Sequence, residues 1–346
     1  MRRKICWLWV CAILVASGHS QSGSDQNPTR VIKAEIQPPV NIRSTVDLVL
    51  ADTLVLDRIK GTPVGGLTVD DFVLYENGVG QQISYFSQDQ LPLSLLLLVD
   101  RGGCLDPFND QVREAIRAIL RGLKPQDRIG LMAFSDHPKL VLGLTSNQSA
   151  VADALGRMPK HESFGGHCFN RALTEAAQYL RDSSKSDARR LIVVITAQRT
   201  GLCNSGPSAR DVSRMLMESS VMVFGILPRT PAQQLESGMY GVATSLRGAL
   251  RIGSLVNLSR IAQETGGEIF NDPPEELAHS FAELTLHLRT RYTLGFVPSN
   301  RRRDGGFRKL KVQLSAPGET RAGKVRIQAR RGYFAPREEA VTMNGR

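Results

Sequence analysis

Hydrophobic and polar positions divide the chain into three patterns. Between residues 32 and 90, short runs of strand-forming residues such as 46–56 are separated by turn residues. Residues 91–290 alternate continuous apolar runs with amphipathic segments of helical period, and strand-type runs return over 291–336. The pattern predicts a β-sandwich-like module, an α/β domain and a C-terminal β extension.

The middle of the chain carries two runs that are apolar at every position, 95–99 and 191–195. Strands buried on both faces of a parallel sheet have this pattern, because helices cover both faces. Strands that alternate with helices of this length imply right-handed crossovers, so we expect a doubly wound, mostly parallel sheet. Further strands are expected at 128–134, 139–143, 221–226 and 268–270, and helices at 107–122, 148–157, 169–182, 208–219, 255–265 and 274–289.

The two β-rich ends carry turn signals. Asn77 and Gly78 tolerate positive φ and predict a hairpin that joins the strand 72–76 to a partner at 82–86. After Arg291 we expect strands at 292–298, 307–314 and 324–334. These C-terminal strands could either extend the α/β sheet or rejoin the N-terminal β module.

The first 20 residues have the three parts of a secretory signal peptide. Arg2, Arg3 and Lys4 precede an apolar run over 5–16, and small residues lead to Ser20. The run is shorter than the roughly 20 residues that a membrane-spanning helix needs. We expect a secreted or periplasmic protein without a transmembrane segment after cleavage. Residues 21–31 are expected to form a disordered leader, and 337–346 a tail.

The net charge bears on the class of ligand that we expect the protein to bind. The chain carries +11, and loss of the three basic signal residues leaves 11 − 3 = +8. No basic stretch is interleaved with aromatic residues, so we expect no nucleic-acid binding, and the export signal favours a protein or an anionic envelope surface as the ligand. The run 301–303 is followed at once by Asp304 and Gly305, which is typical of a hairpin rim.

Seven segments of the sequence together resemble one family. Their order and spacing resemble those of the von Willebrand factor type A-related proteins of Acidobacteria, over about residues 40–336. The resemblance implies a non-enzymatic α/β binding domain. The segments are GLTVDDFVLYENGVGQQI (66–83), DRIGLMAFS (127–135), FGGHCFNRAL (164–173), RRLIVVIT (189–196), ETGGEIF (264–270), RYTLGFVP (291–298) and RRGYFAP (330–336).

The resemblance also implies where a metal site would be. Such domains ordinarily hold Mg²⁺ at a metal-ion-dependent adhesion site (MIDAS), with oxygen ligands from DxSxS, a threonine and a second aspartate. Only Asp100 remains here, because Gly102 and Cys104 replace the serines, His167 the threonine and Ala197 the last aspartate. Glycine and alanine supply no side-chain ligand, and cysteine is too soft for Mg²⁺. We therefore expect a degenerate site without a metal or other cofactor.

Three loops carry these positions, at 100–108, 163–169 and 197–207, and we expect them to form a metal-independent recognition face. The residues expected on it are Asp100, Arg101, Gly102, Gly103 and Cys104 in the first loop, Gly165, Gly166, His167 and Cys168 in the second, and Ala197, Gln198 and Arg199 in the third.

Cys104, Cys168 and Cys203 all fall in these loops. In an oxidising compartment two of them are expected to form a disulfide, preferably Cys168 with Cys203, and to leave one thiol. The alternatives are independent loop residues, a soft-metal site made by Asp100, Cys104 and His167, or a Cys/His nucleophilic site. Because no residue that would orient the histidine is identifiable, we expect no enzyme.

The sequence therefore supports three functions in order. The first is protein or surface binding through the three loops. The second is a structural or assembly role in the cell envelope, with the β module as the contact surface. The third is a metal or thiol enzyme. We expect the remaining histidines, including His279 and His287 on one predicted helix, to face solvent or a partner.

Overall fold

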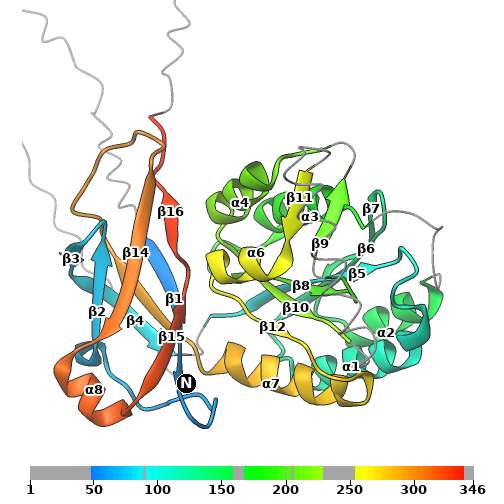
Figure 1. Ribbon diagram of the computed structural model, residues 1–346, viewed down its shortest axis with the longest axis horizontal. Coiled ribbons are helices and arrows are strands. Elements are labelled where there is room, and N and C mark those ends of the chain that lie inside the picture. The colour runs from blue at the N-terminus through cyan, green and yellow to red at the C-terminus, as the bar shows by residue number, and fades with distance from the viewer. Residues whose placement is uncertain are drawn as a thin grey trace, which may run out of the picture. The chain divides into compact units, whose positions relative to one another are not determined.

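The computed structural model describes residues 48–88, 91–158, 167–198, 200–203, 206–228 and 254–338 (Figure 1). Of residues 200–203, 254 and 255 it describes the backbone alone. The predicted signal peptide, leader and residues 339–346 of the tail lie outside these ranges, as do His161, Gly165, Gly166 and Arg199. The described residues all belong to one compact unit.

A six-stranded sheet forms the centre of the α/β part, in the order β12-β10-β8-β5-β6-β7. All neighbours are parallel except β6 and β7. This arrangement confirms the predicted fold class. The strands are β5 (Leu93–Asp100), β6 (Arg128–Phe134), β7 (Pro138–Thr145), β8 (Arg189–Ile195), β10 (Val221–Ile226) and β12 (Ile269–Phe270).

Alternate residues of β5 point into two different cores. Leu95 and Leu97 pack with buried residues of α1, α2 and α7, whereas Leu96 and Leu98 pack with those of α3, α4 and α6. Helices therefore cover both faces of the sheet (Figure 1). They are α1 (Asn109–Gly122), α2 (Gln148–Arg157), α3 (Phe169–Ser183), α4 (Ala209–Glu218), α6 (Leu258–Thr265) and α7 (Leu277–Arg289), with 3-10 turns η2 (Asp106–Phe108) and η3 (Pro274–Glu276).

Two four-stranded sheets enclose a third core and form a β-sandwich, in the orders β15-β1-β13-β4 and β16-β14-β2-β3. The strands that follow residue 291 therefore pair with the N-terminal strands, and the α/β part is inserted between β4 and β13. The elements are β1 (Val49–Asp57), β2 (Phe72–Glu76), β3 (Val79–Gln81), β4 (Ile83–Gln88), β13 (Tyr292–Phe296), β14 (Phe307–Leu314), β15 (Val325–Ala329) and β16 (Gly332–Phe334), with η1 (Val69–Asp71) and α8 (Ala316–Ala322).

The predicted hairpin has its turn in place but a different partner strand. Asn77 and Gly78 have φ of 48° and 86°. The partner of β2 is β3, whereas β4 pairs with β13 in the other sheet, so the prediction of 82–86 as the partner is wrong. The chain changes sheets between β3 and β4, as strands do at the corners of a sandwich.

Several short elements differ from the expected ones. β9 (Thr200–Cys203) and β11 (Ser254–Asn257) form a separate two-stranded sheet that the sequence did not indicate. The expected helix at 255–265 begins only at Leu258, because Asn257 caps it by accepting from the backbone N–H of Arg260. The expected strand 324–334 is divided into β15 and β16.

His287 is buried, which corrects the expectation that it faces solvent or a partner. Its side chain is 3% exposed and its Nδ1 lies 3.1 Å from Oε1 of Glu268. Ser280 and Leu284, also buried, lie seven and three residues before it on α7, so helical spacing already places His287 inside. His279 is exposed. No helix within the described ranges has the length and apolar character needed to cross a bilayer.

A buried arginine joins the α/β part to the sandwich. Arg189, at the start of β8, lies with its Nε 3.0 Å from Oδ1 of Asp52 and donates from Nη2 to the hydroxyl of Thr293 at 2.8 Å. It also donates to the carbonyl of Leu288 at the end of α7. Because Asp52 and Thr293 are on the paired strands β1 and β13, this one side chain connects an N-terminal and a C-terminal strand of one sandwich sheet to the central sheet.

Candidate functional site

The predicted site residues meet at the carboxyl ends of two neighbouring parallel strands. Asp100 ends β5, Thr196 follows β8, and His167 stands just before α3. Open α/β sheets bind their ligands at this edge. Asp100 and Thr196 are fully buried, while 22% of the His167 side chain is exposed.

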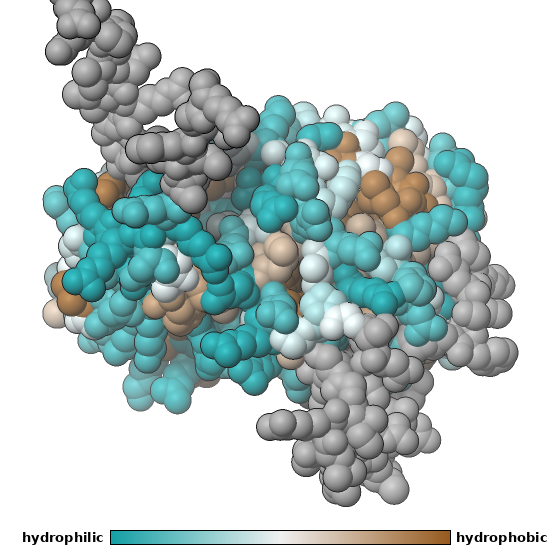
Figure 2. Space-filling view, turned by 90° about the horizontal axis from the view of Figure 1, so that it is seen from above, coloured by the Kyte–Doolittle hydropathy of each residue, from teal (hydrophilic) through white to brown (hydrophobic). Residues whose placement is uncertain are grey.

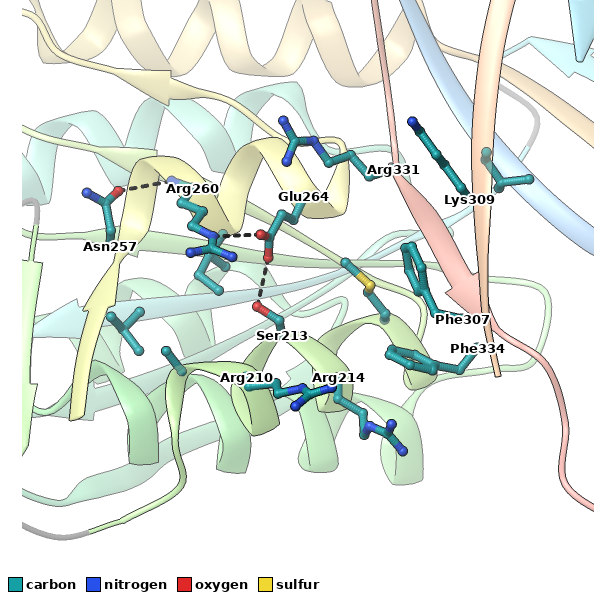
Figure 3. Close-up of a pocket in the computed structure, with 15 residues that line it drawn as sticks. Arg210, Ser213, Arg214, Asn257, Arg260, Glu264, Phe307, Lys309, Arg331 and Phe334 are labelled. Atoms are coloured by element: carbon teal, nitrogen blue, oxygen red, sulfur yellow. Dashed lines mark hydrogen bonds and ion pairs between the residues drawn. The ribbon is translucent and has the colours of Figure 1, made fainter. Parts of the chain in front are cut away.

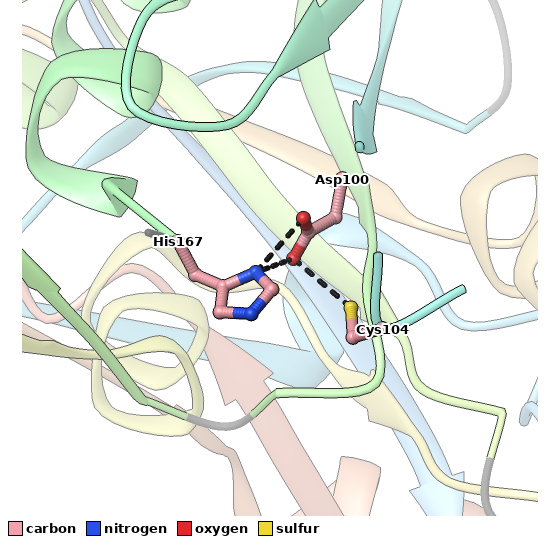
Figure 4. A group of neighbouring side chains, drawn as sticks. All are labelled: Asp100, Cys104 and His167. Atoms are coloured by element: carbon pink, nitrogen blue, oxygen red, sulfur yellow. Dashed lines mark hydrogen bonds and ion pairs between the residues drawn. The ribbon is translucent and has the colours of Figure 1, made fainter. Parts of the chain in front are cut away.

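The carboxylate of Asp100 lies between His167 and Cys104 and interacts with both (Figure 4). Its Oδ2 accepts from the hydroxyl of Thr196 at 2.6 Å and from the thiol of Cys104 at 3.3 Å. Its Oδ1 accepts from the backbone N–H of Gly102 at 2.9 Å. Nδ1 of His167 lies 2.9 Å from Oδ1 and 2.8 Å from Oδ2. The protein itself therefore satisfies this buried acid.

The positions of Gly102 and His167 depend on each other. A Cβ at residue 102 would lie 2.7 Å from Cε1 and 2.9 Å from Nδ1 of the His167 ring. Such distances are clashes, so a side chain at 102 and this imidazole position exclude each other. Two residues that the sequence analysis matched to MIDAS positions are thus coupled, since the glycine at 102 leaves the space that the histidine occupies.

Electrostatics favour a charged imidazole beside Asp100. Burial lowers the pKa of His167, but its hydrogen bond with Asp100 and the charges of Asp100 and Asp136 outweigh burial and raise that pKa above its usual value. The pKa of the Cys104 thiol is raised far above its usual value by burial and by the neighbouring Asp100 charge. The site therefore pairs a histidine whose charged form is favoured with Asp100, beside a thiol whose neutral form is favoured.

The donor set does not suit the metal that this kind of site usually holds. Mg²⁺ prefers oxygen ligands, which only Asp100 and Thr196 offer among the described groups of this cluster. One ligand atom each from Asp100, Cys104 and His167 lies within 4.8 Å of the others. An O, S and N set of this kind suits a softer cation such as Zn²⁺, and binding would displace the thiol and imidazole protons.

Two residues behave differently from the sequence expectation. Thr196, which the sequence analysis did not select, donates to Asp100 and accepts from the backbone N–H of Gln198. Its signal was its position directly before Ala197 at the end of a buried strand. Arg101, expected on the recognition face, is only 3% exposed and donates from Nη1 to Asn109 at 2.8 Å. It supports the first loop from inside.

The cysteines occupy different environments. Cys104 is a free thiol. Cys168 directly precedes α3, is 5% exposed and, unlike Cys104, is not a free thiol. The backbone of Cys203 ends β9, which packs beside α3. The side chain of Cys203 lies outside the description.

The comparison with known families agrees with the fold. Residues 95–199 match the model of the von Willebrand factor type A domain. The chain therefore contains a von Willebrand factor type A domain, as the sequence resemblance predicted. No match was found among curated proteins.

Several solved structures are similar to this chain. An aerotolerance-related membrane protein from Bacteroides fragilis is 14% identical, with 56% of this chain and 98% of that chain covered at a TM-score of 0.39. BatB from Bacteroides thetaiotaomicron is also 14% identical, with the same two coverages and a TM-score of 0.38. Proximal thread matrix protein 1 from the mussel byssus, with a zinc-occupied MIDAS motif, is 12% identical over 57% of this chain and 48% of that chain, at a TM-score of 0.40.

Proposed function

We propose that the protein is an exported, non-enzymatic module that binds a protein or an envelope surface through the three loops around Asp100, without a divalent cation. One observation carries the proposal. The imidazole of His167 lies against both oxygens of Asp100, in space that a side chain at residue 102 would occupy. In this proposal the positively charged ring of His167 takes the place of a metal ion, because it neutralises the buried Asp100 and holds two loops together.

The state of the thiol argues against catalysis at this site. A nucleophilic cysteine needs a thiolate, which a neighbouring cation stabilises. Here burial and the Asp100 carboxylate raise the pKa of Cys104, and His167 directs its Nδ1 to Asp100. The arrangement suits a loop support better than a nucleophile and its base.

The surface available for recognition differs from the buried support. Asp106 is exposed, and Gln198 and the ring edge of His167 are partly exposed. Asp100, Thr196 and Arg101 are buried beneath them. The proposed face therefore consists of the outer parts of the first and third loops and of His167.

The proposed function is tested by capture from an envelope extract in the presence of EDTA. Proteins retained by the wild type should be lost with Asp106→Arg combined with Gln198→Arg, because both changes alter the proposed face. They should be retained by Asp153→Arg, an exposed position on α2. Mass spectrometry identifies the retained proteins, and titration with the purified partner gives the affinities.

Other outcomes of the same experiment favour the alternatives. Ile59, in a turn of the sandwich, is 87% exposed. Loss of capture with Ile59→Asp but not with the loop variant would favour the structural role with the sandwich as contact surface. Capture that EDTA abolishes and Zn²⁺ restores would favour the soft-metal site of Asp100, Cys104 and His167.

A disulfide between Cys168 and Cys203 is part of the proposal. It is supported by the free thiol of Cys104 and by the packing of β9, which ends at Cys203, beside α3, which begins after Cys168. Such a bridge would fix the second loop to the third. Non-reducing peptide mapping of exported protein should find the linked 168 and 203 peptides and one thiol, at Cys104. Three free thiols, or a bridge to Cys104, would refute this pairing.

A further inference from the structure

A hollow of about 1180 Å³ opens between two helices of the α/β part and two strands of the sandwich (Figure 3). Helices α4 and α6 form one side, and β14 and β16 form the other. It shares no residue with the Asp100 site. Its charged lining consists of five cations and one acid, namely Arg210, Arg214, Arg260, Lys309, Arg331 and Glu264.

Glu264, the single acidic side chain of the lining, already accepts hydrogen bonds from the protein. Glu264 accepts from the hydroxyl of Ser213 and from Nε of Arg260, both at 2.8 Å. Five cations against one carboxylate leave a formal charge of +4 in the lining. Outside it, Glu218 lies 3.8 Å from Arg214. Like charges gathered in a concave surface raise the local concentration of anions.

Apolar groups lie between these cations. The rings of Phe307 and Phe334 are 5.3 Å apart, and the guanidinium of Arg214 lies over the Phe334 ring at 4.5 Å. Met217 and Ile261 contribute further apolar surface. The hollow therefore offers both charge and apolar contact. The face of the molecule in Figure 2 is mainly hydrophilic with several apolar patches.

We propose that this hollow binds an acidic polypeptide segment in which carboxylates alternate with apolar side chains. Arg210 on α4 and Lys309 on β14 stand on opposite walls, so an inserted chain can reach both of them. A flat anionic bilayer cannot contact both walls at once. A segment with carboxylates alone would leave the two phenylalanine rings without apolar contact. This interaction is separate from recognition by the loops and does not depend on it.

The test is fluorescence anisotropy with the full mature chain. The probe is a short fluorescein-labelled peptide in which glutamate alternates with valine and serine, and the reference peptide has glutamine in place of glutamate. Arg210 and Lys309 are exposed, and no side-chain hydrogen bond is described for either; the charge of Asp211 also acts on Arg210. The variant Arg210→Ala with Lys309→Ala should bind the acidic peptide about tenfold more weakly than the wild type does.

Matched controls separate this site from general basicity. Arg301→Ala with Arg302→Ala removes the same charge from an exposed run outside the hollow and should leave the affinity unchanged within about twofold. The thermal midpoint of each variant confirms folding. Equal loss in both double variants, or equal affinity for the glutamate and glutamine peptides, would overturn the proposal. So would binding to phosphatidylglycerol vesicles that requires Arg210 and Lys309 while the peptide does not bind.

Discussion

Replacing Asp100 by alanine is expected to lower the free energy of unfolding by about 3 to 5 kcal/mol, because a buried charge partner is removed and its donors remain. The hydroxyl of Thr196, the N–H of Gly102 and the ring of His167 would all lose their acceptor. Asp100→Asn keeps the volume and one acceptor oxygen, so its loss should be smaller. Urea unfolding followed by circular dichroism measures both changes.

The control for this prediction is Asp153→Ala on the exposed side of α2, which should change stability by no more than about 0.5 kcal/mol. The pH adds a second readout. The folded pKa of His167 is above its usual 6.5, so the ion pair stabilises fully below pH 6.5 and its contribution fades as pH rises through the folded pKa. The difference between wild type and Asp100→Ala should shrink accordingly. An Asp100→Ala protein as stable as Asp153→Ala would contradict the role assigned to the carboxylate.

Introducing the side chains of the MIDAS pattern should create Mg²⁺ binding. The variant Gly102→Ser, Cys104→Ser, His167→Thr and Ala197→Asp places hard oxygen donors around Asp100 and removes the ring that clashes with a side chain at 102. At Mg²⁺ concentrations about a hundredfold above its dissociation constant, such a protein gains about 2.7 kcal/mol in stability. The thermal midpoint of the wild type should not move with millimolar Mg²⁺.

Two further measurements serve as controls for the predicted Mg²⁺ binding. Adding Asp100→Ala to the variant with the MIDAS side chains should abolish the response to Mg²⁺. Zn²⁺ is tested beside Mg²⁺ on the wild type, since its O, S and N cluster suits a softer ion. A wild-type midpoint that rises with Mg²⁺ and falls again with chelator would show that other groups complete the site.

The sequence predicted the central sheet well because its signal is repeated and local. The runs at 95–99 and 191–195 lie within β5 and β8, and β6 and β10 have the expected bounds. Each of these strands is flanked by a helix whose apolar stripe is visible in the sequence. By contrast, β9 and β11 have four residues each, and their paired residues are about 50 positions apart in the sequence. Neither periodicity nor a turn motif therefore indicates them.

The sequence predicted where the site lies but not which side chains contact one another there. Strand ends and the family pattern placed Asp100, Cys104 and His167 together, and they are neighbours. The His167 ring is directed at Asp100 because Gly102 leaves space for it, and this contact between two loops has no signal in the sequence. The burial of Arg101 likewise depends on its hydrogen bond to Asn109, the first residue of α1. Side-chain direction in loops is set by such tertiary contacts and has no period in the sequence.

The insertion of the α/β part into the sandwich has a consequence for the order of folding. β1 finds its partners in β13 and β15, and the hydroxyl of Thr293 donates to Asp52 across 241 positions. Contacts this distant in the chain form late, because a long loop must first close. Every strand of the central sheet precedes β13 in the chain. We therefore expect the apolar strands of 49–88 to stay uncovered, and open to aggregation, until β13 and the strands after it pair with them.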